Sequence, residues 1–185
     1  MVSKTLILCE GGNDIGFINK FCRYLELDMK KIVIQKVSGK SNFFKKSTYI
    51  TIQQQLNRGL YSKILFIIDA DFIENDKNYG GYQNSLNELE KIISTLNFRD
   101  KAKYFIACDP ITKTGNLEHL VLSTLDFRQK ECITKLLDCV LDMEVHSDKK
   151  IVLSSYEAIF KESPYNLTHS NFDGLKGLLE WVGEN

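Results

Sequence analysis

The sequence predicts an α/β fold: a Rossmann-like three-layer sandwich with a mainly parallel sheet of about four strands, followed by a helical C-terminal part. Four short, near-continuous apolar runs alternate with segments in which apolar residues recur at helical spacing. Such runs suit strands that are buried on both faces of a parallel sheet, and the alternation is typical of βαβ units. The 185 residues are 43% hydrophobic and include only two prolines, which fits a single folded domain and excludes a disordered chain.

The expected elements follow one another along the chain. Strands are predicted at residues 5–9, 32–37, 64–68 and 104–108, and helices between them at residues 15–25, 45–60 and 86–96. After Pro110 the helical pattern prevails, at residues 117–125, 129–141 and 172–182, while residues 151–160 fit either a helix or a late strand. We expect residues 1–109 to form an α/β core and residues 110–185 to form a mainly helical extension, packed on the core as a single structural unit.

The chain carries no sequence signal for a membrane or a secretory route. No apolar run approaches the ~18 residues that cross a bilayer, and the start of the chain has no signal-peptide pattern. The five cysteines are odd in number and lack the CxxC spacing of zinc sites. Free thiols in a reducing compartment explain them best, so we expect a cytoplasmic protein without a membrane partner.

Acidic residues directly follow two of the predicted strands. Glu10 comes after the first strand, and Asp69 and Asp71 come after the third. Ligands of open parallel sheets bind beyond the carboxyl ends of the strands, so these carboxylates are expected to meet at one edge. In an extended chain, Asp69 and Asp71 would also point the same way. Gathered carboxylates repel one another unless a cation compensates, and Mg²⁺ (or Mn²⁺) with its preference for oxygen ligands is the natural one.

A glycine-rich turn follows Glu10 and precedes the first predicted helix. Gly11 and Gly12 allow a tight turn whose backbone amides, at a helix N-terminus, can bind phosphate. Asp14 lies in the first turn of that helix. It is either a further metal ligand or a residue that favours the helix N-terminus electrostatically.

The two acidic stretches together resemble the TOPRIM domain, which is shared by topoisomerases, bacterial primases, recombination mediators and the OLD nucleases. The resemblance rests on residues 6–14 (LILCEGGND) and residues 64–71 (ILFIIDAD) and covers roughly residues 4–109. The family's signature is a Glu after the first strand, often in a Glu-Gly-x-x-Asp/Glu stretch, and an Asp-x-Asp after the third. The chain is most similar to small stand-alone TOPRIM proteins related to the OLD nucleases.

The resemblance implies a role for each matching residue. Glu10 would be a metal ligand or general acid/base, and Asp69 and Asp71 would hold Mg²⁺, so that these three are the expected catalytic residues. A Gly-x-Leu-Glu-like stretch follows the fourth strand in the OLD-related proteins, and Gly115-Asn116-Leu117-Glu118 is similar to it. Glu118 would then serve a second metal position, unless it is an ordinary first-turn helix residue. Two metals about 4 Å apart are the usual arrangement for phosphodiester cleavage.

The chain also departs from the larger members of that family. It has no room for topoisomerase gates, no visible zinc domain of a primase and no ATPase of an OLD nuclease. The stretch from Ser38 to Ser41 ends like a Walker motif, but Ile34 stands where the first glycine would be needed. An ATPase, if one is required, is expected to be a separate chain, and a homodimer remains open.

The zero net charge conceals a basic segment. Residues 29–62 contain six Lys and one Arg with no acidic residue, so this segment is +7 and the remainder is −7. Phe43, Phe44 and Tyr49 interleave with the lysines, and they either stack on unpaired bases or turn into the core. The expected phosphate- or nucleic-acid-binding residues are Gly11, Gly12, Gly39, Lys40, Lys45, Lys46 and, as a weak carry-over from related nucleases, Lys150.

The sequence therefore predicts a Mg²⁺-dependent nuclease, or a related phosphodiester-transfer protein, that acts on DNA or RNA. The first alternative is a TOPRIM-like module that binds metal and nucleic acid without its own turnover and works with a partner ATPase in a defence or repair system. A second alternative is a flavodoxin-type protein in which Asp69 accepts a phosphoryl group. His119, next to Glu118, is a further but weaker candidate for the site.

Overall fold

A computed structural model confirms the predicted α/β fold and describes residues 3–98, 100–141, 149–160 and 165–184. Its four strands form one sheet in the order β2-β1-β3-β4, and all three neighbouring pairs are parallel. The strands are β1 (Lys4–Cys9), β2 (Ile32–Lys36), β3 (Tyr61–Asp69) and β4 (Ala102–Ala107). Each overlaps one of the apolar runs, because continuous apolar sequence is what a strand covered on both faces requires.

The helices before β4 are α1 (Gly12–Tyr24), α2 (Lys40–Phe43), α3 (Ile50–Asn57) and α4 (Tyr82–Thr95), with the 3-10 helix η1 (Lys46–Tyr49) between α2 and α3. The helix expected across residues 45–60 is thus two pieces, η1 and α3. The Thr48 hydroxyl donates to Asn42 O at 2.8 Å, which holds the chain in a turn before α3 begins. Side-chain bonds of this kind compete with a continuous helix.

The part after β4 is helical. It comprises α5 (Leu117–Leu122), α6 (Phe127–Leu141), α7 (Lys149–Ile159), the 3-10 helix η3 (Ser170–Phe172) and α8 (Asp173–Gly183). Residues 151–160, which the sequence left as a helix or a strand, lie in or next to helix α7. No helix among the described residues is long and apolar enough to cross a membrane.

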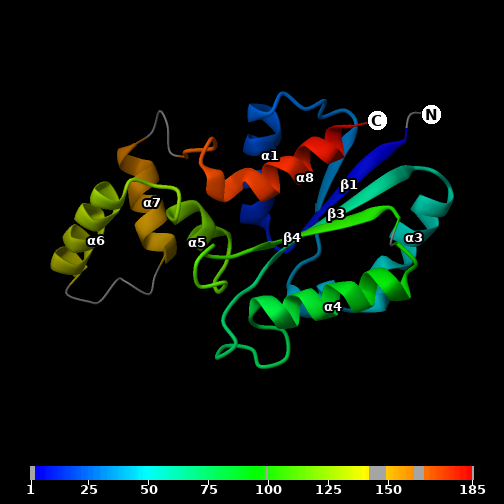
Figure 1. The fold of residues 1–185 in the computed structure, drawn as a ribbon, viewed down its shortest axis with the longest axis horizontal. Helices are drawn as coiled ribbons and strands as arrows, with labels where there is room; N and C mark the ends of the chain where they lie inside the picture. The colour runs from blue at the N-terminus through cyan, green and yellow to red at the C-terminus, as the bar shows by residue number, and fades with distance from the viewer. Residues whose placement is uncertain (1–2, 99, 142–148, 161–164, 185) are drawn as a thin grey trace.

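Helices cover both faces of the sheet (Figure 1). On one face, α1 and α8 pack on a core that includes Ile7, Leu65 and Phe172. On the other, α3 and α4 pack on a core that includes Leu6 and Phe66. Neighbouring strand residues alternate between these two cores, as the pleat of a sheet requires. The last helix, α8, is therefore part of the sandwich itself.

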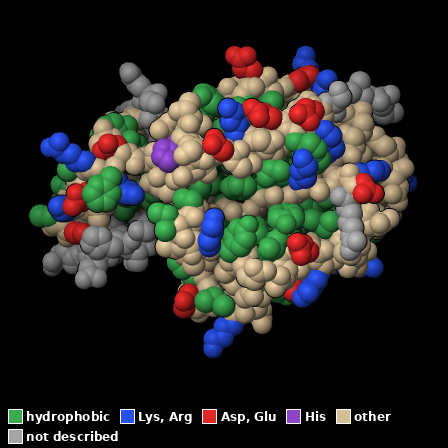
Figure 2. Space-filling model, viewed as in Figure 1, with side chains coloured by type: hydrophobic (Ala, Val, Ile, Leu, Met, Phe, Trp, Pro, Cys, Tyr) green, Lys and Arg blue, Asp and Glu red, His purple; other side chains and the backbone are tan. Residues whose placement is uncertain are grey.

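The helices α5, α6 and α7 lie together beyond the carboxyl ends of the strands (Figure 1). They share a small core of their own, in which Leu122, Ile133 and Val152 are buried. Acidic and basic side chains are intermixed over the face of the molecule drawn in Figure 2. The position of α5–α7 brings them next to the edge of the sheet where the acidic residues were expected.

Candidate carboxylate site

Glu10 and Asp69 meet at the carboxyl edge of the sheet. Glu10 follows β1 directly and Asp69 ends β3, and these two strands are neighbours. The backbone N–H of Asp69 donates to Glu10 Oε2 at 3.4 Å. The structure therefore brings these two predicted residues together, because parallel strands of matched register end at the same edge.

Asp71 does not continue the strand. Its backbone φ is +58°, so the expectation of an extended chain from Asp69 to Asp71 is wrong. The cause is a pair of backbone hydrogen bonds with Gly115: Asp71 N donates to Gly115 O at 2.6 Å, and Gly115 N donates to Asp71 O at 3.1 Å. This bridge turns the chain after Ala70 and ties it to the segment before α5.

Lys40 pairs with one of the predicted carboxylates. Gly39, at a φ of +100°, starts the short helix α2 after β2, and this places Lys40 beside the end of β3. The Lys40 ammonium donates to Ala70 O at 2.7 Å and to Asp71 Oδ2 at 3.0 Å. Its side chain is only 7% exposed, whereas that of Asp71 is 37% exposed. The side chain predicted to face a phosphate thus pairs with a carboxylate in this structure.

Asp14 lies in the first turn of α1 and is buried. Its Oδ2 accepts a 2.7 Å hydrogen bond from the backbone N–H of Gly11. This bond closes the N-terminal turn of α1. It fits the interpretation of Asp14 as a residue that favours the start of the helix, rather than a metal ligand. The bond also occupies the Gly11 amide that the sequence assigned to phosphate.

The loop before α5 holds the second half of the site. The backbone N–H of Leu117 donates to Asp69 Oδ1 at 2.9 Å, and the Asn116 side chain caps α5 by accepting from His119 N. Gly115, at a φ of +87°, has no room for a side chain, because an added Cβ would lie 2.5 Å from the His119 ring. The motif around Gly115 therefore anchors Asp69 and directs Glu118 to the same edge.

Several of these residues border a cavity of about 460 Å³, which we name the carboxylate cavity, whereas the predicted site residues Lys40 and Asp71 do not line it. It is lined by Glu10, Gly11, Gly12, Asn13, Asp14, Lys36, Ser38, Gly39, Asp69, Asn116, Glu118 and Lys150. Most of the predicted residues are among them. Lys45 and Lys46 are exposed and do not line it. Sequence reasoning missed Asn13, Ser38 and Asn116, each of which lies one or a few residues after a predicted strand or motif residue. It singled out Lys36, the last residue of β2, only as part of the basic segment.

The electrostatics of the cavity follow from burial and like charge. Burial, together with the negative charge of Asp71, raises the pKa of Glu10 from 4.5 to about 7. Burial and the charges of Asp14 and Glu10 raise the pKa of Asp69 well above its usual range, and burial raises that of Asp14 as well. Lys40 opposes this shift at Glu10, and Lys150 opposes it at Asp14. The carboxylates lie close enough to repel one another, which is the condition that a bound cation relieves.

The donor chemistry fits Mg²⁺, since carboxylate oxygens are its preferred protein ligands. However, these oxygens do not converge on one point: among the described residues, no three His, Cys, Asp or Glu side chains are placed to hold the same metal ion. Protein hydrogen bonds already hold Asp14, Asp69 and Asp71. Binding a cation at these three carboxylates would require them to give up those hydrogen bonds.

The aromatic residues of the basic segment face inward. Phe43 and Tyr49 are fully buried in the core beneath α3 and α4, and Phe44 packs against that core and the Tyr79 ring. The structure thus supports the interpretation that these rings pack in the core, and not the one in which they stack on unpaired bases. The lysines Lys45 and Lys46 remain exposed beside them.

A family model matches residues 4–168 of the chain; its description is a protein of unknown function, DUF3226. No curated protein and no solved structure matches the chain. The matched region includes all four strands, the carboxylate cavity and helices α1 to α7. The chain belongs to the DUF3226 family.

Proposed function

We propose that the chain is a magnesium-dependent nuclease, or a related phosphodiester-transfer protein, of the TOPRIM type. The observation that carries the proposal is the pair Glu10 and Asp69, which lie at neighbouring strand ends with raised pKa values. Ionising both at neutral pH is costly without a cation, so the site favours a divalent one. Perturbed carboxyl groups in a cavity are typical of functional sites.

The charged groups in and beside the cavity each have a part in this proposal. Glu10, Asp69 and Asp14 would hold the cation, joined by Asp71 once it leaves Lys40, and Glu118 would serve a second position. Bound Mg²⁺ would polarise the phosphoryl oxygen and lower the pKa of a coordinated water. Lys36 and Lys150 line the same cavity and would contact the phosphate backbone.

The test is a cleavage assay on end-labelled single- and double-stranded DNA and RNA, in Mg²⁺, in Mn²⁺ and in EDTA. We expect cleavage only with the metal, and a loss of at least a hundredfold in Glu10→Gln and Asp69→Asn, as for other groups that stabilise a transition state. Asp28→Asn is the matched control, because Asp28 is exposed and precedes β2 at the opposite edge of the sheet. Equal cleavage by wild type and Asp69→Asn would contradict the proposal.

A specific observation favours the binding module as a second candidate. The Lys40 ammonium neutralises Asp71 and lowers the pKa of Glu10, as a cation would. Such a site would stay inactive until a partner or substrate displaced Lys40, which fits a chain that works with a separate ATPase. Metal binding without cleavage in the same assay supports this candidate. The phosphoacceptor alternative has less support, because burial and the neighbouring carboxylates disfavour the ionised form of Asp69 that would attack a phosphoryl donor.

A further inference from the structure

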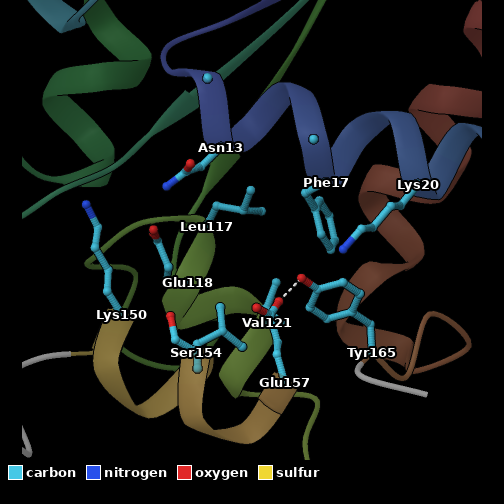
Figure 3. A pocket seen from close by; sticks show the side chains of 13 residues that line it. Asn13, Phe17, Lys20, Leu117, Glu118, Val121, Lys150, Ser154, Glu157 and Tyr165 are labelled. Carbon is cyan, nitrogen blue, oxygen red and sulfur yellow. Dashed lines mark hydrogen bonds between the residues drawn. The ribbon is translucent and has the colours of Figure 1, made fainter. Parts of the chain in front are cut away.

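A second cavity, of about 450 Å³, adjoins the carboxylate cavity between α1, α5 and α7 (Figure 3). We name it the side cavity. Its lining shares Gly12, Asn13, Glu118 and Lys150 with the carboxylate cavity. The two cavities are therefore neighbours, and the side cavity lies next to the metal-binding carboxylates of the proposed function.

Two glycines of α1 line this cavity beside the side chains of Asn13, Phe17 and Lys20. Gly12 and Gly16 are four residues apart, so they lie on the same face of the helix. A Cβ added at either position would meet no atom within 4 Å. Packing therefore does not require glycine at position 16, which costs a helix about 1 kcal/mol relative to alanine. The glycine leaves this part of the wall open to close approach.

The lining combines apolar and polar side chains. Phe17, Leu117 and Val121 give the cavity an apolar floor, and Leu153 extends it. Asn13, Glu118, Lys150, Ser154 and Glu157 bring amide, carboxylate, ammonium and hydroxyl groups to the same space, as Figure 3 shows. A lining that combines apolar side chains with several polar groups suits a ring that carries donors and acceptors on its rim.

Tyr165 closes the far end of the cavity. Its hydroxyl donates to Glu157 Oε1, the contact drawn as a dashed line in Figure 3. Its ring packs edge-on against Phe17, and the Lys20 ammonium lies 4.8 Å from the ring centre. These contacts fix the aromatic ring in place, so this end of the cavity is formed before any ligand binds.

We propose that the side cavity binds the sugar and base of the nucleotide that adjoins the phosphate held at the carboxylate cavity. This inference rests on the proposed function and names its substrate: a strand whose nucleotide is unpaired. The volume, near 450 Å³, is in the range of small-ligand sites. A base in a duplex is stacked and paired, so only a single-stranded or extruded nucleotide can enter.

The experiment measures binding rather than cleavage. Fluorescence anisotropy follows a labelled single-stranded oligonucleotide, the same strand without its bases, and its duplex, all in Ca²⁺ with gels that verify intact strands. Gly16→Leu fills the side cavity. Gly177→Leu is the matched control, because Gly177 is an exposed glycine of α8 where an added Cβ also meets nothing. Both substitutions should preserve or raise Tm, since leucine favours a helix more than glycine does.

We expect wild type and Gly177→Leu to bind the base-bearing strand equally, and Gly16→Leu to bind it at least tenfold more weakly. All three should bind the abasic strand alike, and the duplex should bind more weakly than the single strand. Equal binding of the base-bearing strand by Gly16→Leu and wild type would overturn the inference, as would equal binding of abasic and base-bearing strands by wild type. A free nucleoside monophosphate that binds more tightly than the strand would also overturn it, in favour of a free nucleotide.

The outcome separates this inference from the proposed function. If no substrate is cleaved but Gly16→Leu still abolishes base-dependent binding, the side cavity stands and the nuclease proposal fails. If cleavage requires Glu10 but Gly16→Leu binds and cleaves like wild type, the nuclease proposal stands and the side cavity has no role in binding a base.

Discussion

The Lys40 ammonium lies 3.0 Å from Asp71 Oδ2 at the edge of a site that otherwise gathers carboxylates. It also donates to the backbone oxygen of Ala70, so the end of β3 and the start of α2 are fastened together through one side chain. The positive charge lowers the pKa of Glu10 against burial and the charge of Asp71. Lys40 therefore supplies a positive charge that partly offsets the negative charges of Asp71 and Glu10.

Replacing Lys40 should destabilise the chain when no metal is present. In Lys40→Met, Asp71 and Ala70 O lose their partner, and we expect the free energy of unfolding in EDTA to fall by about 1–3 kcal/mol. Mg²⁺ should restore part of that loss, because it supplies the missing positive charge. Urea denaturation of both forms measures the effect. Lys45→Met, at an exposed lysine five residues away, should change stability by less than about 0.5 kcal/mol; an equal loss in both variants would contradict the role of Lys40.

Stability should depend on pH through Glu10. Its pKa rises on folding from 4.5 to about 7, so the folded chain binds the proton more tightly than the unfolded chain. The stability that protonated Glu10 contributes is present below about pH 4.5 and is lost as the pH rises through about 7. In EDTA, the stability of wild type relative to Glu10→Gln should therefore fall between about pH 5 and pH 8.

Mg²⁺ should remove this pH dependence, because a bound cation keeps Glu10 ionised. The increase in Tm on adding Mg²⁺ should accordingly be larger at about pH 8 than at about pH 5.5, where protons compete with the metal. Thermal unfolding at both pH values measures it. A Tm increase that is independent of pH, or one that persists in Glu10→Gln, would count against a metal site that includes Glu10.

We expect Asp69→Asn to abolish cleavage without lowering the stability of the fold. The amide keeps an oxygen that accepts from Leu117 N and removes a carboxylate that burial and its neighbours disfavour. In EDTA at about pH 8 the variant should be as stable as wild type or more so, by up to a few kcal/mol, while its cleavage is lost. Chemical denaturation in parallel with the cleavage assay measures both. A large loss of stability would show that Asp69 has a structural role instead.

Gly115 should not tolerate a side chain. Gly115→Ala combines a positive φ with a Cβ that would lie 2.5 Å from the His119 ring, so we expect a loss of more than about 2 kcal/mol. Gly59 also has a positive φ but has open space around it, so Gly59→Ala isolates the backbone strain, at about 1 kcal/mol. Adding His119→Ala to Gly115→Ala should recover part of the loss. Equal effects of the two glycine substitutions in denaturant unfolding would contradict this account.

The sheet and the acidic edge could be predicted from the sequence because their signals are local. The apolar run before Asp69 is rich in isoleucine, which favours a covered strand, and parallel strands bring Glu10 and Asp69 to one edge. Helix α7 could not be separated from a strand, since short apolar segments fit both periods.

The contacts between distant segments could not be predicted. Asp71 adopts a positive φ because it pairs with Gly115, which lies 44 positions later in the sequence. The pairing of Lys40 with Asp71, and the inward turn of Phe43, likewise depend on how α2 packs against β3. The side cavity forms where α1 and α7 face each other. The apolar periodicity of each helix does not indicate which other helix it will face.

The most direct test of the central claim is a titration of the chain with Mn²⁺, in which the free-ion signal in electron paramagnetic resonance reports binding. We predict saturable binding by the wild type, competition by Mg²⁺, and loss of the site in the Glu10→Gln, Asp69→Asn double variant, with Asp28→Asn unchanged. Binding that is equal in the wild type and the double variant, or no saturable binding in the wild type, would contradict the claim that these carboxylates form a divalent-cation site.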